Sequence, residues 1–207
     1  KNNQDPVITI AGGGLTWTLQ QDINVANYCQ VRVWAAIAES NQSMTVTFSK
    51  ASNLFSELFG GCVVSFRESN GYGASSQSNV EDAEPTLDLT TTDTNSAIVV
   101  VSGDFNGSDG SSRVWRTVNS ITPTAGNGLE LVYFTDNNNY TAYGAYYSDA
   151  GSVGTKTVGL SAPGLQKYSI AALEVQGSGS VQSDGSGPGR KFRCGGILTK
   201  PNLGVRP

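Results

Sequence analysis

The chain has 207 residues, of which 14% are charged, 38% are hydrophobic and none is histidine. Without histidine, a Ser-His-Asp triad, a Cys-His dyad and a histidine-ligated zinc site are excluded. The sequence contains no run of about 18 apolar residues, so no membrane-spanning helix is predicted. This composition favours an all-β protein with a binding or structural role over an enzyme.

Charge is distributed unevenly along the chain. Residues 1–176 carry 8 basic and 16 acidic side chains, whereas residues 177–207 carry five basic side chains and one acidic side chain. The acidic body argues against nucleic acid as the main partner. The basic end is typical of an arm that lies on an acidic surface, and a solvated tail is the alternative interpretation.

The dominant hydrophobic pattern has a period of two residues, which is typical of β-strands. The alternation is complete over residues 43–49, and residues 97–101 form a continuous apolar run, as in a central strand covered on both faces. One helical turn is predicted near residues 51–57. In chain order, the predicted strands are 15–19, 29–35, 43–49, 62–67, 86–90, 97–101, 113–118, 128–135, 139–148, 155–161 and 167–176.

Turn residues separate these strands, for example Gly12-Gly13-Gly14, Asn70-Gly71 and Asn127-Gly128. Many short strands at this spacing predict an all-β fold, and two packed sheets accommodate them. We therefore expect a two-sheet antiparallel β-sandwich of jelly-roll type over residues 1–176. A Gly/Ser-rich linker is predicted over residues 177–189 and an extended basic C-terminal arm over residues 190–207.

The arm contains large apolar side chains that cannot bury one another within so short a segment. It is therefore expected to dock on a neighbouring subunit and to contribute assembly contacts. The residues assigned to these contacts are Arg190, Lys191, Phe192, Arg193, Ile197, Leu198, Leu203, Val205 and Arg206.

The chain has three cysteines, Cys29, Cys62 and Cys194. Cys29 and Cys62 lie in apolar strand-like runs and are predicted to be buried thiols, with a bridge between them as the alternative. No Cys-x-x-Cys spacing occurs, so a zinc site is not predicted.

Several segments resemble those of a known group of proteins. They are Val100–Phe105 with Ser112–Arg116, Pro123–Leu131, Gly144–Gly151 with Thr157–Pro163, and Tyr168–Val175. In this order they are similar to the β-sandwich domain of minor tail and virion-surface (decoration) proteins of tailed bacteriophages that infect actinobacteria. The resemblance covers residues 5–176, and the end of the chain from Gly196 to Pro207 also resembles tail ends in such proteins.

The resemblance implies a virion component without enzyme activity and supplies no catalytic residues. It also implies a location at the virion surface, on the tail or the capsid, after assembly in the host cytoplasm. We therefore expect a non-enzymatic structural protein that acts through contacts with other virion proteins, in a homo-oligomer or other symmetric assembly. Neither nucleic acid, membrane insertion nor a cofactor is expected.

Two groups of oxygen-bearing side chains are candidates for catalysis or metal binding. The segment Glu81-Asp82-Ala83-Glu84-Pro85 is interpreted as a solvated acidic turn rather than a catalytic acid/base pair. Asp104, Asn106 and Ser108 have the spacing of a calcium loop. However, the sixth position is Asp109 instead of glycine and the twelfth is Trp115 instead of glutamate, so a turn is preferred and no metal is predicted.

An alternative function is a carbohydrate-binding module that recognises a host cell-surface glycan. Exposed aromatic rings beside Asn and Asp provide stacking area and hydrogen-bond partners for sugars. A strand over 139–148 places Tyr140 and Tyr146 on one face and Tyr143 and Tyr147 on the other, so one pair is expected in the core and the other exposed. Ordinary aromatic packing explains the same pattern. The candidate glycan-binding residues are Trp34, Asp136, Asn137, Tyr140 and Tyr143.

Overall fold

A computed structural model of the chain describes residues 7–25, 28–40, 42–51, 61–104, 109–136 and 140–177. Within these ranges the fold is all-β, every strand pair is antiparallel, and no helix occurs. Accordingly, these residues include no helix suited to crossing a membrane. The strands are β1 (Val7–Gly12), β2 (Thr18–Ile23), β3 (Val31–Ala35), β4 (Val46–Ala51), β5 (Ser69–Ala83), β6 (Thr86–Thr91), β7 (Ala97–Asp104), β8 (Val114–Trp115), β9 (Glu130–Asp136), β10 (Tyr140–Tyr147), β11 (Gly154–Ala162) and β12 (Gln166–Gly177).

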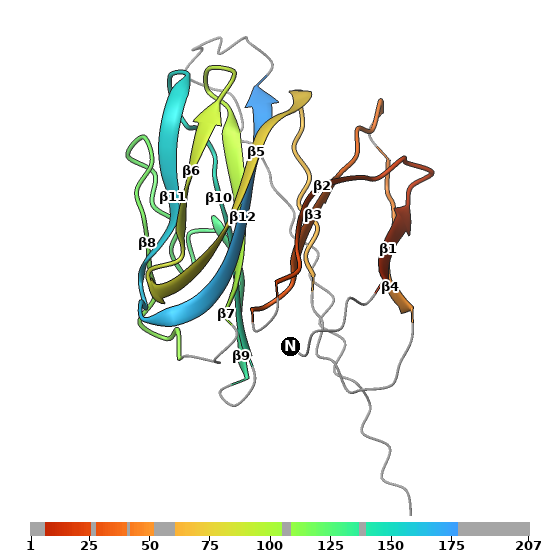
Figure 1. Cartoon of the computed structure of the whole chain (residues 1–207). Helices are drawn as coiled ribbons and strands as arrows, with labels where there is room; N and C mark the ends of the chain where they lie inside the picture. Colours follow the sequence, from red (N-terminus) through yellow and green to blue (C-terminus); the bar gives the residue numbers. More distant parts are fainter. Residues whose placement is uncertain are drawn as a thin grey trace, which may run out of the picture.

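Strands β5 to β12 pair in a nested order. The first strand of this series pairs with the last, β5 with β12; then β6 pairs with β11, and β7 with β10. Further pairs, β7 with β12 and β8 with β11, join these into a five-stranded sheet of order β5-β12-β7-β10-β9 and a three-stranded sheet of order β6-β11-β8. Figure 1 shows the two sheets face to face.

The main apolar core lies between these two sheets. Strand alternation directs every second side chain inward, and each large aliphatic side chain buried in this way contributes about 1.5–3 kcal/mol. The core residues of β6 and β7 are Leu87, Leu89, Ile98 and Val100, and those of β11 and β12 include Val158, Leu160, Tyr168 and Ile170.

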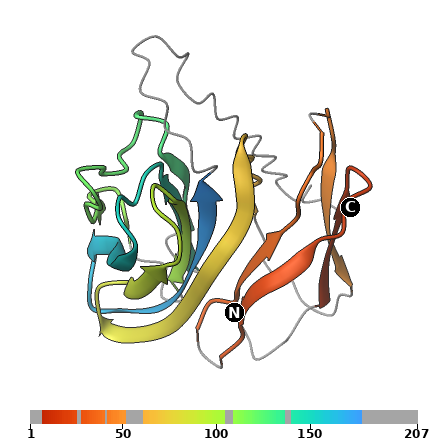
Figure 2. The same ribbon diagram turned by 90° about the horizontal axis from the view of Figure 1, so that it is seen from above.

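The opposite face of the five-stranded sheet is also covered. Ile23 of β2 and Val31 of β3 pack with Ala171 of β12 in a second buried cluster. Farther along the sheet, the Phe66 ring meets the Tyr146 ring edge-on, with centroids 5.8 Å apart. Viewed from above, the β2–β3 hairpin lies beside the five-stranded sheet (Figure 2). Strand β7, in the middle of this sheet, is therefore covered on both faces, as its continuous apolar run predicted.

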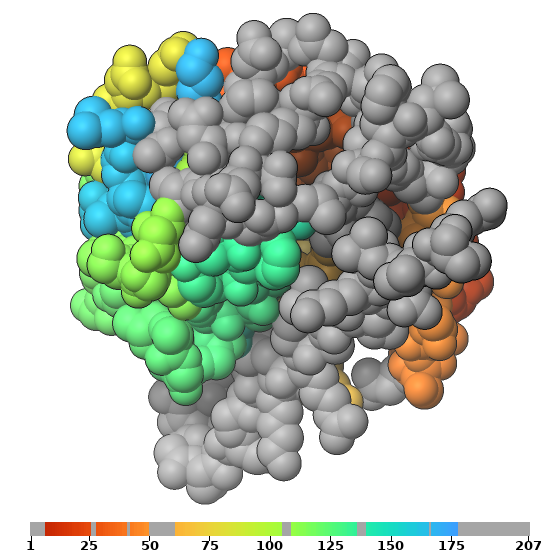
Figure 3. Space-filling view, turned by 90° about the horizontal axis from the view of Figure 1, so that it is seen from below, coloured from red at the N-terminus to blue at the C-terminus, as the bar shows by residue number. Residues whose placement is uncertain are grey.

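Strands β1 and β4 form a separate two-stranded ribbon outside the β2–β3 hairpin. Figure 3 shows the coloured residues of the sandwich on one side of the molecule and the orange residues of the β4 region on the other. On one face of the ribbon, Ile8, Ile10, Val46 and Phe48 are half-buried, while Thr9, Thr47 and Ser49 are exposed. Gly12 ends β1, and an added Cβ there would lie 2.2 Å from the carbonyl oxygen of Thr45; the chain then turns at Gly13 and Gly14.

Some predicted elements differ from the structure. Residues 61–66 form no strand, although a strand was expected over 62–67, and β1 and β5 were not predicted. Asn70-Gly71, expected in a turn, lies within β5. Strand β5 is an edge strand made mostly of Ser, Asn, Gly and Gln, so its two faces do not differ in hydropathy. Ala51 ends β4, and the rest of the predicted helical turn lies outside the described residues.

The two cysteines in the described residues are thiols that are not joined by a disulfide. The prediction that they are fully buried is wrong, because both side chains are half-buried. Cys29 lies directly before β3 against the backbone of Gly103 in β7, where an added Cβ would come within 2.7 Å of the Cys29 Cβ. Glycine at position 103 thus allows the β2–β3 hairpin to approach the sheet closely.

Candidate functional site

The structure brings two of the predicted glycan-binding residues together, because Asp136 and Tyr140 are partners in the β9–β10 register. Trp34 and Tyr140 are half-buried, whereas the Tyr143 side chain has 0% exposure and cannot contact a sugar. Asp136 ends β9, and Asn137 lies outside the described residues. The prediction of one exposed tyrosine pair is wrong, because Tyr143, Tyr146 and Tyr147 are all buried.

These three tyrosines are buried because both faces of the five-stranded sheet are covered. Tyr143 packs within the core between Tyr133 and Tyr168, with ring centroids 5.9 Å and 6.4 Å away. Tyr146 points to the opposite face and is covered by Phe66. Burial raises the pKa of Tyr147 to about 12. Only Tyr140, at the start of β10, keeps partial exposure, and its ring lies 5.5 Å from that of Phe134.

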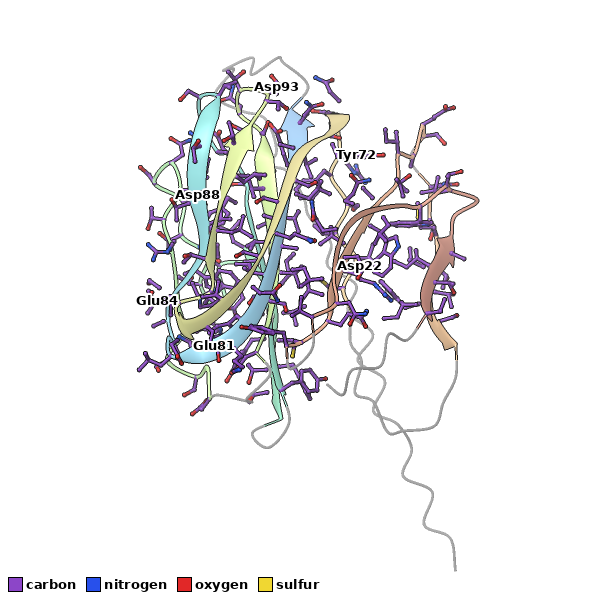
Figure 4. The ribbon with its side chains drawn as sticks, in the orientation of Figure 1. Asp22, Tyr72, Glu81, Glu84, Asp88 and Asp93 are labelled. Atoms are coloured by element: carbon purple, nitrogen blue, oxygen red, sulfur yellow. The ribbon has the colours of Figure 1, made fainter. Side chains whose placement is uncertain are left out.

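The β5–β6 side of the sandwich carries a row of acidic residues. We call Glu81, Asp82, Glu84, Asp88 and Asp93 the acidic edge; the first four are exposed and Asp93 is half-buried. Figure 4 shows Glu81, Glu84, Asp88 and Asp93 following one another along this side. The prediction that the carboxylates at 81–84 are solvated is confirmed, although β5 continues through Ala83 and Glu81 and Asp82 therefore lie in a strand.

One cation of the described residues lies on the acidic edge. Lys167 of β12 places its Nζ 2.5 Å from the Glu81 Oε1, and the Tyr28 hydroxyl donates to the Glu81 Oε2 at 3.1 Å. The hydrogen bond from Lys167, followed by that from Tyr28, lowers the pKa of the Glu81 carboxyl. Because the Lys167 and Glu81 side chains are 33% and 47% exposed, water screens the ion pair and it contributes little to stability, and the edge keeps a surplus of negative charge.

The carboxylate of Glu174 is buried and holds together three elements. It accepts hydrogen bonds from the Ala74 amide at 2.9 Å, from the Thr92 amide and hydroxyl, from the Asp93 amide at 3.0 Å and from the Ser96 hydroxyl at 2.7 Å. Burial alone raises the pKa of Glu174, but the hydrogen bonds from Ser96, Ala74, Thr92 and Asp93 outweigh burial and leave it below its usual value. Glu174 therefore fastens the β6–β7 turn to β5 and β12.

A second carboxylate, Glu130, joins β8 to β9. It accepts hydrogen bonds from the Arg113 Nε at 2.7 Å and the Trp115 Nε1 at 2.8 Å, and the Arg113 Nη2 also donates to it. The Arg113 guanidinium lies 3.7 Å from the centroid of the Tyr133 ring. The hydrogen bond to Glu130 raises the pKa of Arg113. A carboxylate with these partners is a structural link rather than a general base.

The calcium-loop pattern does not form a cation cage in the described residues. Asp104 ends β7 and is fully buried, while residues 105–108 lie outside the described ranges. Asp109 accepts hydrogen bonds from the Ser111 amide at 2.9 Å and hydroxyl at 3.0 Å, which closes its own turn. Nowhere in the described ranges do three or more Cys, Asp or Glu side chains come together as a metal site requires.

The hydrogen-bonding roles of Glu174 and Glu130 were not predicted from the sequence. For Glu174, the sequence does contain a signal: it lies between Leu173 and Val175 in an apolar strand, where a buried carboxylate needs hydrogen-bond partners. The predicted assembly residues at 190–207 lie outside the described residues. Comparison of the chain with protein-family models, curated proteins and solved structures found no match.

Proposed function

We propose that this chain is a non-enzymatic structural component of a tailed-phage virion, a minor tail or capsid-surface protein that acts through assembly contacts. The observation that carries this proposal is the nested pairing of β5 to β12 in two sheets. An eight-stranded double sheet is the arrangement of jelly rolls, which recur in viral capsid and lectin domains.

Because one fold serves many functions, the roles of individual side chains also matter. The two buried glutamates, Glu130 and Glu174, both hold strands and turns together. Their hydrogen bonds favour a rigid body over a reactive site. The exposed charged side chains on the β5–β6 side, Glu81, Asp82, Glu84 and Asp88, are all acidic, which suits a basic partner segment.

The basic segment supplied by the chain itself is the C-terminal arm, residues 190–207. Its five basic side chains and the acidic body would attract one another between copies, and salt would weaken this attraction. The 13 residues of the preceding linker, 177–189, would span about 20 Å as a random coil. Burial of the arm's apolar side chains on a neighbour would offset the entropy lost when the arm becomes ordered.

The test is to delete residues 190–207 and supply the shortened chain during particle assembly. We expect a circular dichroism spectrum and thermal melt like those of the full chain, but no incorporation into particles. A chain whose residues 177–189 are replaced by a Gly/Ser linker of equal length is the matched control, because it retains the arm. Normal incorporation of the shortened chain would contradict the proposal.

The alternative function, recognition of a host cell-surface glycan, is favoured by one observation. Tyr140 is half-buried and stacks in a tilted pair with Phe134 at the end of the β9–β10 hairpin. This pair would present an aromatic surface to a sugar ring. Binding of the full chain to host cell wall, and its loss on Tyr140→Ala but not on Tyr72→Ala in β5, would support the glycan-binding function.

A further inference from the structure

The strand β1 differs from the other strands that border a sheet in the described residues. Edge strands leave a row of backbone groups open to pairing with another chain, and proteins protect them with charges, proline or short length. Every other such strand has this protection. The charged residues of these strands are Asp22 in β2, Arg32 in β3, Lys50 in β4, Glu81 and Asp82 in β5, Asp88 in β6 and Asp136 in β9, and β8 has only two residues.

Strand β1, with the sequence Val-Ile-Thr-Ile-Ala-Gly, has no charge and no proline. It pairs with β4 on one side only; on its outer side it pairs with no described residue. The Val7 side chain is 61% exposed. The residues of β1 also have high β-propensity, because valine, isoleucine and threonine are β-branched. The outer edge of β1 is therefore well suited to accept an added strand.

A third strand would also stabilise the ribbon formed by β1 and β4. Two-stranded sheets are marginally stable in water, and three or more strands are needed for independent stability. One face of the ribbon carries the half-buried apolar residues Ile8, Ile10, Val46 and Phe48, and the other face is exposed and includes Thr9, Thr47 and Ser49 together with Val7. An added strand would extend both faces if its own residues alternated between apolar and polar.

We propose that the C-terminal arm of a neighbouring copy adds to the outer edge of β1 as a third strand. This inference rests on the proposed function, because it names the surface on which the arm docks. The start of the arm alternates as required over residues 191–194: Phe192 and Cys194 fall on one side of an extended chain, and Lys191 and Arg193 fall on the other. In such β-augmentation, main-chain hydrogen bonds provide affinity and alternate side chains provide specificity.

The competing surface for a basic arm is the acidic edge of the sandwich. Docking there would depend on charge and would fall steeply with salt. Docking on β1 would depend on backbone hydrogen bonds and on apolar contacts along the ribbon. Substitutions on β1 therefore separate the two surfaces, because β1 contributes no side chain to the acidic edge.

The test joins two differently tagged full-length proteins by a disulfide. One carries Thr9→Cys with Cys194→Ser, and the other carries Arg193→Cys with Cys194→Ser. Thr9 is on the exposed face of β1, the face on which Arg193 would lie. The matched control replaces Thr9→Cys by Ser49→Cys, because Ser49 lies opposite Thr9 in the register, is equally exposed, and belongs to β4.

Under mild oxidation we expect about tenfold more mixed-tag disulfide with Thr9→Cys than with Ser49→Cys, which corresponds to a preference of about 1.4 kcal/mol. Equal yields from the two positions would overturn the proposal. A third variant carries Thr9→Cys, Arg193→Cys and Cys194→Ser in one chain. If the disulfide in this variant forms within single chains, the arm packs on its own ribbon, and the proposal is overturned.

A second measurement uses charge instead of a crosslink. Thr9→Lys introduces the protective edge charge that β1 lacks, and we expect it to reduce incorporation into particles about tenfold relative to Ser49→Lys, with unchanged thermal melts. Suppose that neither Thr9→Cys nor Thr9→Lys differs from its control at Ser49, but that deletion of residues 190–207 still blocks incorporation. The arm then docks on a surface other than β1, and the assembly function stands. If that deletion has no effect, the assembly function itself fails.

Discussion

Glu174 shows how a charged side chain becomes a structural element within a β-sandwich. The side chain is buried, and its two oxygens accept hydrogen bonds from three backbone amides and two hydroxyls. The position also constrains its neighbours. A Cβ at Gly73 would lie 2.3 Å from the Glu174 Oε2 and 2.7 Å from the Thr92 Oγ1, so only glycine fits there without a rearrangement.

We predict that Glu174→Gln destabilises the protein by about 1–3 kcal/mol, because the new amide group would meet donors instead of accepting from them. The free energy of unfolding in urea measures this change. Glu81→Gln is the matched control, since Glu81 is exposed, and we expect it to change stability by less than about 0.5 kcal/mol. Equal effects of the two substitutions would contradict the role assigned to Glu174.

The effect of Glu174→Gln should also depend on pH. The pKa of Glu174 is lowered in the folded protein, so the unfolded chain binds a proton more readily. The carboxylate therefore contributes its full stability above the unfolded pKa of about 4.3, and this contribution is lost as the pH falls through the folded value. Urea titrations of the wild type and the variant between pH 7 and pH 3 test this, and a stability difference that stays constant in this range would refute the prediction.

At the scale of the element, β8 shows how a very short strand is held in place. It has two residues and pairs with β11, while its contact with β9 is made by side chains. Arg113 and Trp115 both donate to Glu130, the first residue of β9, and the side chains of Arg113 and Glu130 are 11% and 8% exposed. Strands β8 and β9 are the two middle strands of the series β5 to β12, so the side-chain contact between them completes the nested order.

We predict that Glu130→Ala costs about 3–5 kcal/mol, because it leaves the Arg113 charge in a largely buried position without its carboxylate. Arg113→Met combined with Glu130→Ala should cost less than the sum of the two single substitutions, as a double-mutant cycle in urea would measure. The more exposed pair of Lys167 and Glu81, whose side chains are 33% and 47% exposed, is the comparison; Glu81→Ala should cost no more than about 1 kcal/mol. Additive effects at positions 113 and 130 would contradict the link.

At the scale of the whole molecule, the layers should differ in local stability. Strand β7 lies in the middle of a sheet covered on both faces, whereas β1 and β4 form a two-stranded ribbon at the outside. We predict that the β7 amides are the slowest to exchange with solvent and the β1 amides are among the fastest. Amide exchange of the chain lacking residues 190–207 measures this without the arm, and equal protection of β1 and β7 would be the contrary result.

Much of the strand content could be predicted from the sequence, because alternation is a local property. Strands β6, β7, β9, β10, β11 and β12 lie within a few residues of their predicted bounds. The predicted segment 62–67 alternates but forms no strand; it provides Phe66 as a cover for Tyr146. Strand β5 lacks alternation and is nonetheless the longest strand of the described residues, because its partner β12 supplies its backbone hydrogen bonds.

The sequence by itself determined that the chain is all-β, because period-two patterning and turn residues act within a few positions of one another. Only the tertiary structure decided which strands pair, which tyrosines are buried and where the carboxylates find their partners. The physical reason is separation along the chain: Glu174 meets Ser96 and Thr92 from about 80 positions away, and β12 meets β5 from farther still. Alternation distinguishes the two faces of a strand, but what covers each face depends on the elements that fold against it.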